Sequence, residues 1–141
     1  MLIDTHTHLY SEQFENDIED VIARAKENGV QRFYLPAIDQ SYTEKMLNLE
    51  TQYPNEMFAM VGLHPCSVHA ETLDAEMNHV REWLDKRDFK AIGEIGIDLF
   101  WEKAYLKEQQ DAFKTQIEWA KEKNLPIVIH CRDAFNEVFE V

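Results

Sequence analysis

Two histidines, His6 and His8, stand one residue apart at the end of the first apolar run of the chain. Side chains alternate between the two faces of a strand, so a strand through this run would point both imidazoles the same way, together with Asp4. Two neighbouring imidazoles can hold one divalent ion such as zinc, iron or nickel. The spacing therefore predicts a metal site at the end of this run.

Three further polar motifs each follow an apolar run of strand length. They are Gly62-Leu-His-Pro65, Gly93-Glu-Ile-Gly-Ile-Asp98 and His130-Cys-Arg-Asp133. The carboxyl ends of parallel strands gather at one end of a sheet or barrel, where barrel enzymes build their active sites. We therefore expect the four motifs to converge on one site.

Glu94 lies between glycines in an otherwise apolar run. A buried carboxylate is costly unless it is paired or bound to a metal, so Glu94 is a candidate for a carboxylate that bridges two ions. The alternative is a buried ion pair with a lysine or arginine. By strand parity Asp98 lies on the same face as Glu94, where it would orient a ligand or an arginine rather than bind metal itself.

Two histidines and an arginine complete the candidate set. His130 ends a buried run and is predicted to bind metal, the alternative being a core or capping histidine. His64 precedes a proline and is therefore biased to extended backbone; it could contact substrate or tune the site, or be purely structural. Arg132 could clamp a phosphate or carboxylate through two hydrogen bonds, or pair with Asp133 or Asp98.

The cysteines and tryptophans have simpler interpretations. Cys66 and Cys131 lie beside the site motifs, where thiolate ligation is possible, but we interpret both as small apolar spacers. Trp83 and Trp119 fit helix packing. Trp101 follows the fourth predicted strand and is the tryptophan placed to meet a substrate, for example by stacking on a base.

Short apolar runs alternate with amphipathic helical stripes along the chain. Strands are predicted over 2–9, 32–38, 56–62, 89–97 and 125–130. Gly29 and Asn124 are predicted helix stops, residues 41–44 have the form of a capping box, and Asp133 could cap a fifth helix.

This alternation predicts parallel strands with helical crossovers, in the α/β class. No Gly-x-Gly-x-x-Gly follows the first strand, which disfavours a dinucleotide-binding sheet. The polar residues at the ends of the first, third, fourth and fifth strands favour a (β/α)8 TIM barrel. Such a barrel needs roughly 250 residues. We therefore expect residues 1–141 to form the first four to five βα units, the N-terminal part of a single barrel domain; the alternative is a complete open sheet of five strands. As part of a barrel standing alone, the chain would leave its first and fifth strands as open apolar edges.

The composition restricts the partners. The chain has 141 residues and a formal net charge of −13, spread evenly and without a basic block. Binding to nucleic acid through many neutralised phosphates needs clustered lysine and arginine, so bound cations would have to supply the positive charge for any phosphate ester. No apolar run is long enough to span a membrane, no secretory signal is present, and two cysteines make a disulfide framework unexpected. These features favour a cytoplasmic protein without membrane partners.

The four motifs, in this order and at these spacings, resemble the TatD family of metal-dependent deoxyribonucleases over the whole chain. The resemblance implies a barrel of the amidohydrolase type that holds two divalent ions, of Mg, Mn or Zn. It makes His6 and His8 ligands of one ion, Glu94 a ligand between the ions and His130 a ligand of the other. His64 and Arg132 join Glu94 as candidate catalytic residues.

The resemblance implies hydrolysis of DNA phosphodiester bonds by metal-activated water, of the 3′-to-5′ exonuclease type, on single strands or 3′ ends. The family pattern also requires a histidine and an aspartate from later strands, which these residues do not include, and Leu99-Phe-Trp101 stands where many members have tyrosines. Two alternatives remain open. One is a small-molecule amidohydrolase or lactonase on the same scaffold; the other is an inactive half-barrel that self-associates, the full-length protein being a monomer.

Overall fold

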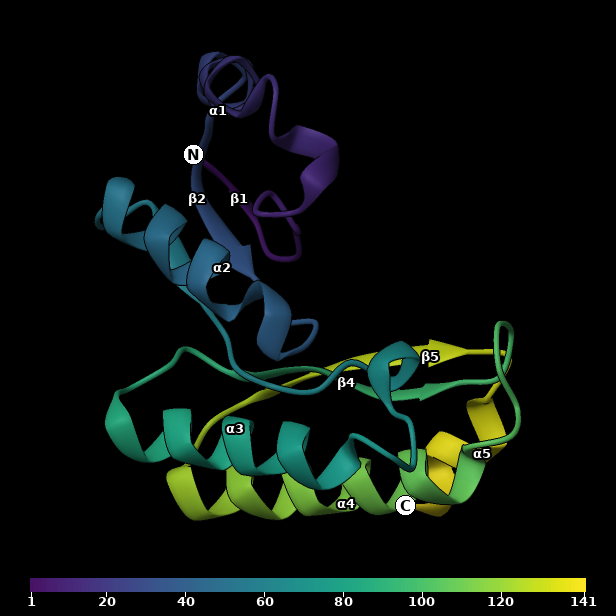
Figure 1. The fold of residues 1–141 in the computed structure, drawn as a ribbon. Helices are drawn as coiled ribbons and strands as arrows, with labels where there is room; N and C mark the ends of the chain where they lie inside the picture. The colour runs from purple at the N-terminus through teal and green to yellow at the C-terminus, as the bar shows by residue number, and fades with distance from the viewer.

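The computed structural model describes residues 1–141 and consists of five parallel strands alternating with helices (Figure 1). The strands are β1 (Leu2–Asp4), β2 (Val30–Leu35), β3 (Met57–Ala59), β4 (Ile92–Asp98) and β5 (Ile127–Arg132). The helices are α1 (Ile18–Glu27), α2 (Gln40–Gln52), α3 (Leu73–Lys86), α4 (Leu106–Lys123) and α5 (Phe135–Glu140), with short 3-10 turns η1 (Glu12–Phe14) and η2 (Pro65–Ser67). The predicted βα alternation is confirmed.

The strands follow one another in space in the order of the sequence. β1 pairs with β2 and β2 with β3, and β4 pairs with β5, all in parallel. A single bridge between Val61 and Ile92 joins the two groups, supported by a 2.9 Å bond from the Gly93 N–H to the Val61 carbonyl. Sequential parallel order with helical crossovers is the arrangement of a β/α barrel.

The helices cover the strands, and Figure 1 shows α3 and α4 side by side beneath β4 and β5. All seven residues of β4 are buried, whereas the outer strands are not: Leu2 and Ile3 in β1 are 58% and 42% exposed, and Ile129 in β5 is 47% exposed. The prediction of open apolar edges is confirmed. No helix is both long and apolar enough to cross a membrane.

The strand boundaries differ from the predicted ones. β1 ends at Asp4, well short of residue 9, because the Asp4 carboxylate accepts the His6 N–H at 3.1 Å and turns the chain. β2 begins two residues early and ends at Leu35, before Pro36, which has no N–H to continue a ladder. β3 is shorter at both ends, and β4 and β5 begin later than predicted.

Two of the predicted helix signals are confirmed and two are wrong. Gly29 and Asn124 follow α1 and α4 with positive φ of 90° and 53°. α2, however, is capped by Asp39, whose carboxylate accepts the Ser41 N–H at 3.0 Å, so Ser41 lies inside the helix and forms no capping box. α5 begins after Ala134, and Asp133 instead takes up a left-handed conformation with φ of 51°.

Candidate metal centre

Glu94 lies at the centre of the site, on the buried strand β4, and is 6% exposed. Its neighbouring glycines are required by the close approach of β5. A Cβ on Gly93 would lie 2.6 Å from the Cβ of Val128, and one on Gly96 would lie 2.0 Å from the His130 carbonyl oxygen. The glycines thus let the two strands pack closely enough to bring His130 beside Glu94.

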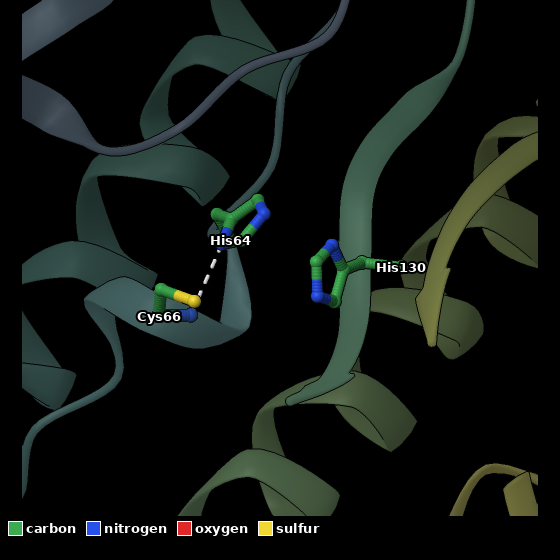
Figure 2. A group of neighbouring side chains, drawn as sticks. All are labelled: His64, Cys66 and His130. Carbon is green, nitrogen blue, oxygen red and sulfur yellow. Dashed lines mark hydrogen bonds between the residues drawn. The ribbon is translucent and has the colours of Figure 1, made fainter. Parts of the chain in front are cut away.

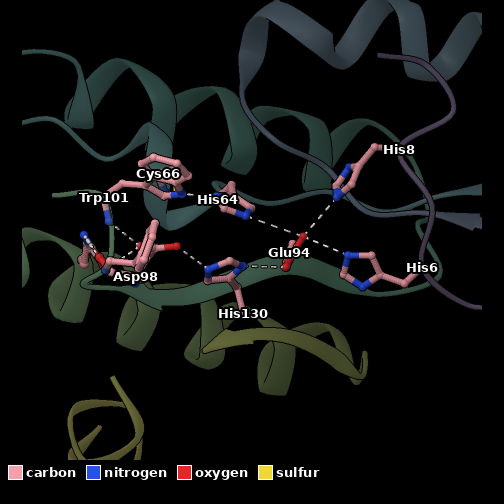
Figure 3. Close-up of polar contacts among 10 residues, drawn as sticks. His6, His8, His64, Cys66, Glu94, Asp98, Trp101 and His130 are labelled. Atoms are coloured by element: carbon pink, nitrogen blue, oxygen red, sulfur yellow. Dashed lines mark hydrogen bonds and ion pairs between the residues drawn. The ribbon is translucent and has the colours of Figure 1, made fainter. Parts of the chain in front are cut away.

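Four histidines surround the Glu94 carboxylate (Figure 3). Oε2 lies 3.0 Å from His6 Nε2, 3.2 Å from His8 Nε2 and 3.7 Å from His64 Nε2. Oε1 lies 2.9 Å from His130 Nδ1. The predicted convergence of the four motifs is therefore confirmed, and the two oxygens of one carboxylate face different histidines.

Tyr10 fixes the orientation of His8. The Tyr10 hydroxyl donates to the Pro36 carbonyl and lies 2.9 Å from His8 Nδ1. Since the single hydroxyl hydrogen goes to the carbonyl, His8 Nδ1 must be the donor in the second contact. Neutral His8 therefore carries its proton on Nδ1 and points the lone pair of Nε2 at Glu94.

His130 lies between two carboxylates. Its Nδ1 faces Glu94, and its Nε2 is 2.8 Å from Asp98 Oδ2. A neutral imidazole has only one N–H and cannot donate to both. A carboxylate behind the ring is the arrangement that orients metal-binding histidines, and Asp98, only 2% exposed, is well placed for that role.

The pKa values in the cluster favour an ionised Glu94, a protonated His130 and a neutral His64. Burial alone would raise the pKa of Glu94, but hydrogen bonds from His130 and His8, which these nitrogens donate only when the rings are protonated, hold it well below its ordinary value. The hydrogen bond to Glu94 raises the pKa of His130 against the effect of burial. Burial lowers the pKa of His64 to about 4, so this side chain is neutral near pH 7.

A cation fits this donor set. The unprotonated Nε2 of neutral His8 faces a carboxylate oxygen, and two acceptors at 3.2 Å repel each other unless a proton or a metal ion lies between them. His6, His8 and Glu94 offer ligand atoms that all lie within 4.8 Å of one another. Imidazole nitrogens with carboxylate oxygens suit zinc, iron or manganese.

The predicted placement of His6 and His8 is wrong. His6 and His8 do not share a strand face with Asp4; they lie in the loop after β1 and reach Glu94 from there. Arg132 forms neither of the ion pairs, with Asp133 or Asp98, that were the alternative to a phosphate clamp. Its guanidinium instead packs over Phe100, with Cζ 3.8 Å from the ring centroid.

A second group of possible ligands comprises His64, Cys66 and His130 (Figure 2). The backbone N–H of Cys66 donates to His64 Nδ1 at 3.0 Å, which occupies that lone pair and leaves the proton of neutral His64 on Nε2. Partial burial of the thiol and the nearby charge of Asp98 raise the pKa of Cys66 to about 12. A protonated thiol is a poor ligand, so the histidines around Glu94 are the better metal site.

Sequence reasoning missed Tyr10 and two buried glutamines of α4. Gln109 forms two hydrogen bonds with the backbone of Asp98. Its Oε1 accepts the Asp98 N–H at 2.8 Å and its Nε2 donates to the Asp98 carbonyl at 3.1 Å. Gln116 accepts the N–H of Leu63, the residue before His64, at 2.8 Å. The sequence feature that could have revealed the two glutamines is their spacing, since they are polar residues seven apart on the apolar stripe of a helix.

Comparison with known proteins agrees with this geometry. A family model described as TatD related DNase matches residues 3–141. An uncharacterized metal-dependent hydrolase of Bacillus subtilis, YabD, is 36% identical over all 141 residues, which cover 54% of that protein. A 3′-5′ ssDNA/RNA exonuclease TatD of Pectobacterium carotovorum is 31% identical over 94% of this chain and 51% of its own.

The fold matches as well. The crystal structure of YjjV, a TatD homologue of Escherichia coli, superimposes with a TM-score of 0.86 at 30% identity, covering 97% of this chain and 53% of that one. The chain belongs to the TatD-related DNase family of metal-dependent hydrolases, with a fold of the TIM-barrel type. It spans about half the length of the curated relatives it matches and thus corresponds to part of a barrel.

Proposed function

We propose that the protein carrying this chain hydrolyses phosphodiester bonds of single-stranded nucleic acid from the 3′ end, using divalent cations held at Glu94. The observation that carries the proposal is the carboxylate itself, whose Oε2 faces His6 and His8 while its Oε1 faces His130. Each oxygen would then serve a different ion, so Glu94 would lie between two cations. Nucleic acid as substrate is supported by the exonuclease name of the Pectobacterium relative.

In this proposal His6 and His8 hold one cation, His130 holds the other, and Glu94 contacts both. Bound divalent ions would supply Lewis-acid stabilisation of the phosphate and lower the pKa of water. Tyr10 and Asp98 keep His8 and His130 in the tautomers that present a free nitrogen to Glu94. The cations would also offset part of the net charge of −13, which otherwise repels a polyanion.

His64 and Arg132 are proposed to contact the substrate. The neutral His64 ring carries its proton on Nε2, 3.7 Å from Glu94 Oε2, where that N–H could donate to a phosphate oxygen. The Arg132 side chain forms no ion pair within the chain, so its guanidinium is available to a phosphate. Neither side chain binds metal in this proposal.

The test uses the protein at its natural full length and a 5′-labelled single-stranded oligonucleotide, with Mg²⁺, Mn²⁺ or Zn²⁺. We expect shortening from the 3′ end that Glu94→Gln abolishes and that Glu102→Gln, an exposed glutamate of the loop after β4, leaves unchanged. Calorimetric titration with Mn²⁺ should show tight binding by the wild type and its loss in Glu94→Gln. A metal-loaded protein that leaves both DNA and RNA intact would contradict the nuclease proposal.

A small-molecule amidohydrolase or lactonase is the second candidate. It is favoured by the even acidity of the chain, which offers no basic track for a nucleic acid. A panel of amides, lactones and phosphodiesters assayed with the same metal-loaded protein separates the two candidates. Turnover confined to the lactones or amides would support the second.

A further inference from the structure

Two large aromatic side chains are exposed next to the candidate metal centre. Phe100 and Trp101 follow β4 and are 49% and 71% exposed. Their rings pack edge to face, with centroids 4.8 Å apart. Exposed aromatic surface beside a polar site is a candidate for ligand binding.

Hydrogen bonds to one carboxylate connect these aromatic residues to the candidate metal centre. Asp98 Oδ1 accepts the backbone N–H of Phe100 at 2.9 Å and that of Trp101 at 3.2 Å, while Oδ2 contacts His130 at 2.8 Å. Figure 3 shows the resulting row, in which Trp101 and Asp98 lie at one end, His130 follows, and Glu94 lies beyond it. The loop is therefore held at a fixed place beside the ligand His130.

A positive charge lies on the same surface. The Cζ atom of Arg132 is 3.8 Å from the centroid of the Phe100 ring and 5.4 Å from that of Trp101. Arg132 follows His130 by two residues at the end of β5. The surface thus combines the π face of an indole with a guanidinium, which match the base and the phosphate of a nucleotide.

We propose that Phe100, Trp101 and Arg132 form a nucleobase subsite beside the Glu94 cluster, in which a base of the bound substrate stacks on the indole of Trp101. This subsite rests on the proposed function and identifies the base as the part of the substrate that is recognised. Stacking accepts any base, because every base has a π face. The subsite therefore confers affinity for nucleotides without sequence preference.

The test is a binding experiment that requires no turnover. The protein at its natural full length, loaded with Mn²⁺, is titrated calorimetrically with thymidine 5′-monophosphate and with 2-deoxyribose 5-phosphate, which lacks the base. We expect the nucleotide to bind more tightly by roughly 5- to 150-fold, the range for stacking of one base on an aromatic side chain. Trp101→Ala should remove this difference, and Trp101→Phe, which keeps a π face, should retain most of it.

Trp119→Phe is the matched control, since Trp119 lies on α4 and packs against the core. Folding of Trp101→Ala is checked by its melting temperature, which should change little because the side chain is mostly exposed. Equal affinity for the two ligands, no measurable nucleotide binding, or an unchanged difference in Trp101→Ala would each overturn the subsite. Base-dependent binding without hydrolysis of any phosphodiester would instead keep the subsite and refute the nuclease proposal.

Discussion

Replacing Gln109 by leucine tests whether α4 holds the metal centre in place. The Gln109 amide satisfies both the N–H and the carbonyl of Asp98, at 2.8 Å and 3.1 Å, and both residues are only 2% exposed. Leucine fills a similar volume but offers neither a donor nor an acceptor. The substitution would therefore leave two backbone groups of Asp98 without partners, in a place that water does not reach.

The expected cost follows from those two groups. A buried donor or acceptor left without a partner costs about 1–3 kcal/mol, so the loss of unfolding free energy should be about 2–6 kcal/mol. A domain of this size is stable by only about 5–15 kcal/mol, so such a loss is easily measured. A second effect should reach the metal, because Asp98 orients His130. Disturbing such an outer partner typically weakens metal binding by about 10- to 100-fold.

Urea denaturation in the presence of EDTA measures the loss of unfolding free energy. Calorimetric titration with Mn²⁺ measures the loss of metal affinity. Gln110→Leu is the matched control, being the same substitution at the half-buried next position of the helix. If Gln109→Leu loses no more stability than Gln110→Leu, the two hydrogen bonds contribute little to folding. If stability falls but the Mn²⁺ affinity of the folded protein is unchanged, Gln109 does not act on the metal centre through Asp98.

Three further predictions concern single residues around the site. Tyr10→Phe removes the acceptor that fixes the His8 tautomer, so Mn²⁺ affinity measured by calorimetry should fall by about 10- to 100-fold; an unchanged affinity would show that His8 needs no such support. Gly96→Ala would put a Cβ 2.0 Å from the His130 carbonyl oxygen at a φ of +147°, so we expect circular dichroism to show no cooperative melting, and a wild-type melting temperature would contradict this. Burial lowers the pKa of His64 from 6.5 to about 4, so the unfolded chain binds more protons at this residue between these values, and His64 alone should cost the metal-free protein about 2 kcal/mol between pH 7 and pH 5. His64→Gln should lack this loss in urea titrations at the two pH values, and an equal loss in both proteins would refute the assignment.

The fold could be predicted because the periodicity of the chain is strong. Short apolar runs and helical stripes alternate five times, and the parallel ladders and crossovers of the structure follow that pattern. Strand and helix boundaries could not be predicted as well, because side chains that hydrogen-bond to nearby backbone groups decide where an element begins or ends. The Asp4 carboxylate captures the His6 N–H and ends β1 early, and Asp39 caps α2 in place of the expected Ser41. These are contacts of side chains with nearby backbone that hydrophobic patterns do not report.

The convergence of the site residues could be predicted for the same reason as the fold, since parallel strands carry their ends to one place. The sequence left two possibilities for Glu94, an ion pair with a lysine or arginine, or a metal. The structure rules out the ion pair, because the charged partners of Glu94 are all histidines. Lysine and arginine carry their own positive charge, whereas a histidine is neutral near pH 7 unless a neighbour or a metal changes it.

Which histidine nitrogen carries a proton depends on atoms that no spacing reveals. The Tyr10 hydroxyl is committed to the Pro36 carbonyl, and this alone decides that neutral His8 presents a lone pair to Glu94. His130 has two carboxylate partners and, when neutral, only one proton to share between them. When the histidines are neutral, the cluster therefore has more hydrogen-bond acceptors than N–H groups to serve them. The missing positive charge is supplied either by protons on the histidines or by a metal ion. Protons supply that charge best at low pH and a divalent cation supplies it near neutral pH, which is why metal binding is the function that this hydrogen-bond arrangement supports.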